Sequence, residues 1–190
     1  METPSTVLST SGRTVVLGLG NPVLSDDAVG LAVVSALRKL LITVPIPGVD
    51  VLASTRAGFE LIDLLRDYGR AILVDCLAIP DPQPGRVRRL ALDDVAGSSR
   101  LVNAHELSVG VAFQLAERMG IPMPSEVEIL AIEAADTCTI FEGLTPAVEA
   151  VVVPLSREIY EDLKRRAPAD EPPDTEDFRA RRAFYAPDTD

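Results

Sequence analysis

Runs of apolar residues along the chain alternate with segments in which apolar residues recur at helical spacing. Continuous apolar runs predict buried strands, and the alternation of basic and apolar residues over 86–92 predicts an exposed, antiparallel edge strand. The predicted strands cover 15–19, 49–53, 71–74, 86–92 and 127–132. The predicted helices run from an N-cap at Ser25 to about Leu40, over 58–68, from around His105 to Met119, and from Thr145 as N-cap and Pro146 to about Arg166. This alternation predicts an α/β fold, a three-layer α/β/α sandwich around a mostly parallel, five-stranded twisted sheet.

The strands and helices occupy residues 14–166 of the 190-residue chain, which suits one domain with a full hydrophobic core. Residues 1–13 are polar and rich in Ser and Thr, and we expect a flexible N-terminal segment there. Residues 167–190 are rich in Pro and acidic side chains, which predicts a flexible tail.

The charge of the chain narrows the classes of partner. A formal net charge of -11 and a pI of about 4.6 speak against nucleic acid, because phosphate binding needs a concentrated Lys/Arg surface. The apolar runs are too short for a membrane span, and the start of the chain has no signal-peptide pattern. We therefore expect a cytoplasmic protein with no nucleic-acid or membrane partner. The two cysteines, Cys76 and Cys138, form no CxxC pair.

Candidate chemical groups collect where the predicted strands end. Asp26 and Asp27 follow the first strand, Asp75 ends the third, and His105 begins a helix. Each alone has an ordinary structural explanation, such as a carboxylate in a first helical turn, a turn residue or a surface histidine. Ligands of such sheets bind at the carboxyl ends of the strands, however, and two carboxylates with one imidazole suit nickel, zinc or a similar divalent ion. The helix dipole at His105 favours the neutral, ligating imidazole.

Two other chemistries are weaker. Gly18-x-Gly20 begins a dinucleotide-binding fingerprint, but Val23 stands at the third glycine position and the second strand lacks the ribose-binding acid. Cys76 is a possible nucleophile with His105 as its base, although a cysteine at a strand end usually packs as a small apolar residue.

Residues 18–30, 71–75, 103–107 and 143–149 form four segments in a fixed order. Together they resemble the hydrogenase maturation endopeptidases, the processing proteases of [NiFe]-hydrogenase large subunits. Residues 18–30, GLGNPVLSDDAVG, resemble the family signature GxGNxxxxDDGxG, with Asp27 at its second acidic position. Residues 71–75 (AILVD) resemble the family's strand with the second acid, and residues 103–107 (NAHEL) resemble its segment around the metal-contacting histidine. Residues 143–149 (GLTPAVE) resemble the start of its last helix. Peptidyl-tRNA hydrolases share the GLGNP turn alone. Residues 53–58, ASTRAG, depart from the family's DGGTxG and keep only its last glycine, a change that bears on which large subunit is recognised.

The resemblance implies an endopeptidase that removes the C-terminal extension of a [NiFe]-hydrogenase large-subunit precursor after nickel insertion. It implies that Asp27, Asp75 and His105 are the catalytic and metal-contacting residues, in an aspartic-type site. They would contact the nickel of the precursor, and the protease would need no permanent cofactor. The alternatives are a non-enzymatic maturation chaperone that binds nickel or the large subunit, and a peptidyl-tRNA hydrolase-like esterase.

Overall fold

A computed structural model describes residues 12–55, 59–96, 104–141 and 143–167, without the side chains of 95–96 and 104–108. Its secondary structure extends from Thr14 to Arg166. The predicted tail beyond residue 167 and all but the last two residues of the predicted N-terminal segment lie outside these ranges. Within them, no helix combines the length and the apolar character that crossing a bilayer requires.

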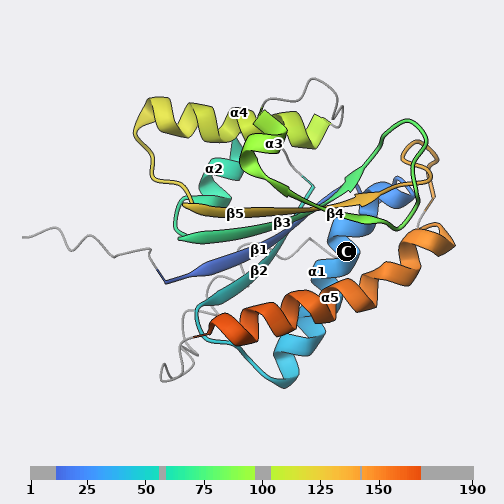
Figure 1. Ribbon diagram of the computed structural model, residues 1–190, viewed down its shortest axis with the longest axis horizontal. Helices are drawn as coiled ribbons and strands as arrows, with labels where there is room; N and C mark the ends of the chain where they lie inside the picture. Colours follow the sequence, from blue (N-terminus) through green and yellow to red (C-terminus); the bar gives the residue numbers. More distant parts are fainter. Residues whose placement is uncertain (1–11, 56–58, 97–103, 142, 168–190) are drawn as a thin grey trace, which may run out of the picture.

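A five-stranded sheet in the order β2-β1-β3-β5-β4 forms the middle layer (Figure 1). Its parallel strands are β1 (Thr14–Leu19), β2 (Val49–Ser54), β3 (Arg70–Leu77) and β5 (Glu126–Glu133). The edge strand β4 (Val87–Ala91) is antiparallel to β5. The mostly parallel sheet and the antiparallel edge strand are thus confirmed, and the buried strands are the continuous apolar runs.

Helices cover both faces of the sheet (Figure 1). On one face lie α1 (Val29–Thr43) and α5 (Pro146–Arg166), and on the other lie α2 (Glu60–Leu65), α3 (Leu92–Ala96) and α4 (Ala104–Met119). Each face has its own apolar core. Successive side chains of a strand point to opposite faces of the sheet, so one strand contributes to both cores. In β3, Val74 and Cys76 pack on the α1/α5 side, whereas Ala71 and Leu73 pack on the α2/α4 side.

Glycines let the first helix approach β1 closely. A side chain at Gly18 would have its Cβ 2.3 Å from the carbonyl oxygen of Gly30, which excludes any larger residue. Gly20 has φ of +150° and would place a Cβ 2.0 Å from the carbonyl oxygen of Asp27. The glycines of the signature segment therefore serve close backbone packing at the end of β1 and do not indicate a dinucleotide site.

Three local predictions were wrong in detail. The first helix begins as a 3-10 turn, η1 (Asp26–Ala28), and the side chain of Ser25 makes no capping hydrogen bond. Asp75 does not end its strand, because β5 continues to pair with β3 as far as Leu77. The described helix α2 ends at Leu65, three residues before the predicted end at Tyr68.

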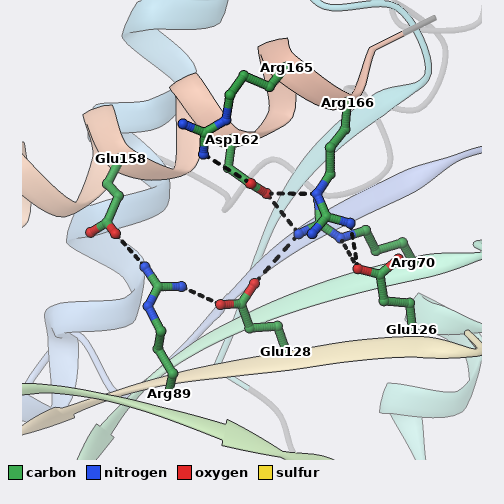
Figure 2. Close-up of polar contacts among 8 residues, drawn as sticks. All are labelled: Arg70, Arg89, Glu126, Glu128, Glu158, Asp162, Arg165 and Arg166. Atoms are coloured by element: carbon green, nitrogen blue, oxygen red, sulfur yellow. Dashed lines mark hydrogen bonds and ion pairs between the residues drawn. The ribbon is translucent and has the colours of Figure 1, made fainter.

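At the edge where the parallel strands begin, a network of ion pairs holds the end of α5 to the sheet (Figure 2). The guanidinium of the buried Arg70 lies 2.8 Å from an Asp162 carboxylate oxygen and 3.2 Å from a Glu126 oxygen. Arg89 pairs with Glu128 of β5 and with Glu158 of α5. Because these pairs join β3, β4 and β5 to the last turns of α5, they fix that helix at the edge opposite to the candidate site.

Candidate active site

The strand order reverses direction at β1, because β2 lies on one side of it and β3 lies on the other. From β1 the chain passes through α1 to β2, and it then crosses the other face through α2 to reach β3. Pairing between β1 and β3 ends at Gly18 and Val74, so Asp75 lies just beyond the last paired residue. Asp27 lies in η1, which follows β1. Sheets of this kind bind their ligands at such a switch point.

Cys76 makes a hydrogen bond to each of the two candidate carboxylates. Its thiol lies 2.8 Å from Oδ1 of Asp27 and donates a hydrogen bond to it. Its backbone N–H donates to Oδ1 of Asp75, also at 2.8 Å. Asp27 and Asp75 are both buried, at 8% and 2% exposure, so water does not disperse their charge. Both predicted acids are therefore buried and in contact with Cys76, Asp27 through its thiol and Asp75 through its backbone.

The same contacts argue against Cys76 as a nucleophile. Its side chain is fully buried in the core between the sheet and helices α1 and α5. A nucleophilic thiol has to reach a substrate carbonyl, whereas this one is enclosed and directed at a carboxylate. Cys76 instead orients the acids on both sides of it.

Asp26 has a different role from its neighbour. Its carboxylate is fully buried and accepts four hydrogen bonds, from the N–H groups of Ala135, Asp136 and Thr145 and from the Thr145 hydroxyl, at 2.7–3.0 Å. These contacts tie the start of α5 and the segment after β5 to the turn that carries Asp27. No local sequence pattern indicates this role, because the partners lie 109 to 119 residues further along the chain.

His105 lies in the first turn of α4, where the sequence predicted a helix to begin. That end of α4 lies above the carboxyl ends of the parallel strands (Figure 1). The opposite end of the helix leads to Ser125, whose N–H donates to the carbonyl oxygen of Gly69 at the start of β3. The side chain of His105 lies outside the described residues, so its predicted contact with the two acids stays a prediction. Among the side chains that are described, no three His, Cys, Asp or Glu residues form a metal-binding group.

Comparisons with known proteins agree on one family. A sequence model of the hydrogenase maturation proteases, HycI, matches residues 31–162, a range that contains Asp75 and His105 and begins shortly after Asp27. The hydrogenase 2 maturation protease of Escherichia coli strain K12 is 27% identical over 154 residues, which are 80% of this chain and 91% of that protein.

Solved structures give the same result. The E. coli hydrogenase maturating endopeptidase HybD is 25% identical with a TM-score of 0.66, over 80% of this chain and 93% of that one. A hydrogenase 2 maturation peptidase from a Thaumarchaeota archaeon is 26% identical with a TM-score of 0.53, over 80% and 97% of the two chains. These relatives are peptidases, which decides against the binding-only chaperone and the peptidyl-tRNA hydrolase-like esterase. The chain belongs to the hydrogenase maturation protease family, and it is a peptidase with a role in hydrogenase maturation.

Proposed function

We propose that this peptidase removes the C-terminal extension of a [NiFe]-hydrogenase large-subunit precursor once that precursor holds nickel. The observation that supports the proposal most directly is that Asp27 and Asp75, both buried, each accept a hydrogen bond from Cys76 near the switch point of the sheet. Buried carboxylates attract a cation strongly, because little solvent screens their charge. In this proposal the cation is the nickel of the substrate.

His105 completes the proposed set of ligands. It lies one helical turn before Val109, and Val109, Ala112 and Ala116 are the buried residues with which α4 packs on the sheet. The spacing of four residues places position 105 on the same helical face as Val109. Asp75 lies on the same side of β3, because Leu73, two residues earlier, packs in the α2/α4 core. A neutral imidazole is favoured at this helix start, since the dipole opposes a second positive charge there.

The chemistry that we propose is a hydrolysis directed by the metal of the substrate. Asp27, Asp75 and His105 provide two oxygen ligands and one nitrogen ligand and leave other coordination positions to the precursor's own groups. A carboxylate of the pair orients the attacking water and takes its proton, and that proton then passes to the amine as the peptide C–N bond breaks. Such a set holds nickel less tightly than a closed thiolate site, so we propose that the enzyme keeps no metal of its own.

The decisive experiment compares nickel-loaded and nickel-free precursor as substrates, with the mass of the product measured by mass spectrometry. We expect the wild-type enzyme to shorten only the loaded form. His105→Ala, Asp27→Asn and Asp75→Asn should abolish or greatly slow trimming while the fold is kept. Equal cleavage of the nickel-free form would refute recognition through the metal. Full activity of His105→Ala would remove the histidine from the site.

A further inference from the structure

Three exposed apolar side chains gather beside the proposed active site. Val23, Ile140 and Phe141 are 49%, 81% and 58% exposed. They lie on two paired segments, because Leu24 and Ile140 form an antiparallel bridge and the N–H of Phe141 donates to the carbonyl oxygen of Val23 at 3.1 Å. Val23 and Phe141 lie on one face of this pair, and Ile140 lies on the other. We call Val23, Ile140 and Phe141 the apolar rim. Several large apolar side chains exposed on one short structural unit commonly mark an interaction site.

The segment that carries the rim is held in place by many hydrogen bonds. Oδ1 of Asp136 accepts hydrogen bonds from the N–H groups of Cys138 and Thr139, both at 2.9 Å. The N–H of Ser25 donates to the carbonyl oxygen of Thr139, and that of Asp26 donates to the carbonyl oxygen of Asp136. Ile140 and Phe141 are therefore exposed on a braced segment. Their exposure does not result from fraying.

The rim is also continuous with the active site. The turn that begins with Val23 leads within four residues to Asp27, and the Asp26 carboxylate ties that turn to the start of the rim segment. The segment after β5 lies beside the start of α1 at the carboxyl ends of the strands (Figure 1). A polypeptide whose scissile bond lies at Asp27 and Asp75 would pass close to this surface.

The backbone of Ile140 indicates what form of polypeptide would fit. The bridge between Leu24 and Ile140 is a non-hydrogen-bonded pair, in which the bonds are made by the residues on either side. In this pattern the N–H and C=O of Ile140 point away from residues 23–25. No backbone partner for either group is present in the part of the chain that the structure describes. An extended chain can therefore pair there as an added strand.

We propose that the apolar rim docks the substrate, by binding an extended apolar segment of the large-subunit precursor next to its scissile bond. This inference rests on the proposed function. It adds to that function a surface that recognises the polypeptide of the substrate, separate from the residues that recognise its metal. Asp27, Asp75 and His105 would then recognise the loaded metal centre, while Ile140 and Phe141 set the preference for apolar residues near the cleaved bond.

A matched pair of variants tests the rim. Ile140→Ser removes the most exposed apolar side chain of the rim. Ile42→Ser makes the same change at a 64% exposed position in the last turn of α1, which leads to the opposite edge of the sheet. With nickel-loaded precursor, we expect Ile140→Ser to raise KM about tenfold with kcat unchanged, as loss of one buried aliphatic contact predicts. Ile42→Ser should match the wild type, and thermal denaturation should show both variants folded.

The outcomes separate this inference from the proposed function. If the wild type trims the precursor and Ile140→Ser trims it with an unchanged KM, the rim does not dock the substrate. An equal rise in KM for Ile42→Ser would mean that the effect is not specific to the rim. If sedimentation shows a wild-type dimer that Ile140→Ser dissociates, a second copy of the chain covers the rim and the proposal is wrong. If the wild type trims nothing, the proposed function fails, and binding of immobilised precursor to the two variants still decides the role of the rim.

Discussion

The two adjacent acids of the signature segment should separate stability from activity when each is replaced by its amide. Asp26→Asn and Asp27→Asn are the same substitution at neighbouring buried positions. The structure gives Asp26 four hydrogen-bond donors from the segment after β5 and the start of α5. It places Asp27 against the Cys76 thiol, next to Asp75. We therefore expect Asp26→Asn to act on stability and Asp27→Asn to act on catalysis.

The contacts of Asp26 set the size of the stability loss. Oδ2 accepts three of the four hydrogen bonds and Oδ1 accepts the fourth, from the N–H of Thr145. An asparagine keeps at most the three at Oδ2, and its NH₂ group then faces the Thr145 N–H, donor against donor. A lost hydrogen bond to a charged group costs about 1.5–3 kcal/mol, and the unsatisfied buried donors add to that. We expect a loss of about 3 kcal/mol, which lowers Tm by about 6–12 °C for a domain of this size.

Asp27→Asn should cost less, within about 1 kcal/mol, because an amide oxygen still accepts the hydrogen bond from Cys76. Its trimming of nickel-loaded precursor should nevertheless be lost, since the amide removes the charge that attracts the metal. Urea denaturation gives the two free energies of unfolding, and kcat/KM measured well below each Tm gives the activities. The assignment is refuted if Asp26→Asn is as stable as the wild type, or if Asp27→Asn unfolds several kcal/mol more easily than Asp26→Asn.

Three further predictions address the thiol, the tail and acid stability. Cys76→Ala should keep most of the activity because the thiol is not the nucleophile. Cys76→Ser keeps a hydrogen-bond donor for Asp27 and should differ little from the wild type. Loss of trimming in both variants would restore a thiol mechanism. Truncation after Arg166 should leave Tm unchanged, and a large drop by calorimetry would show that the tail packs on the domain. The pKa of Glu133 is lowered by the hydrogen bond from the Gln83 N–H and, against the opposing effect of burial, by the ion pair with Arg88. Its contribution to stability is therefore present above the ordinary glutamate pKa of about 4.3 and is lost on further acidification. Glu133→Gln should therefore make the fall in the free energy of unfolding between pH 6 and pH 3 less steep, as measured by denaturation at each pH.

Much of the fold follows from local patterns in the sequence. The continuous apolar runs gave the central strands, and the alternation around Arg88 gave the edge strand because one side of that strand faces solvent. Thr145 and Pro146 gave the start of α5, since proline suits a first helical position. The positions of Asp27 and Asp75 at one edge followed from topology, because the carboxyl ends of parallel strands meet there.

Contacts between segments that are distant in the sequence could not be predicted from local patterns. The side chain of Thr145 makes no capping bond within its own helix, because its hydroxyl is used by Asp26, which is 119 residues away. The end of β3 depends on how far β5 continues to pair with it, and the residues around Asp75 do not indicate where that pairing stops. The apolar rim was also missed, because Ile140 and Phe141 are only two apolar residues in a loop until the bridge to Leu24 places them beside the active site.

The 3-10 turn at the end of β1 explains how two consecutive aspartates serve different neighbours. A 3-10 helix has three residues per turn, so consecutive side chains point about 120° apart. Asp26 is thus directed to the segment that carries the apolar rim, while Asp27 is directed to Cys76 on β3. One short turn consequently sets the distance between the surface that we propose for the polypeptide and the acids that we propose for its metal. Asp26 therefore holds this spacing through its contacts with the segment after β5 and the start of α5, which is why its replacement should cost stability.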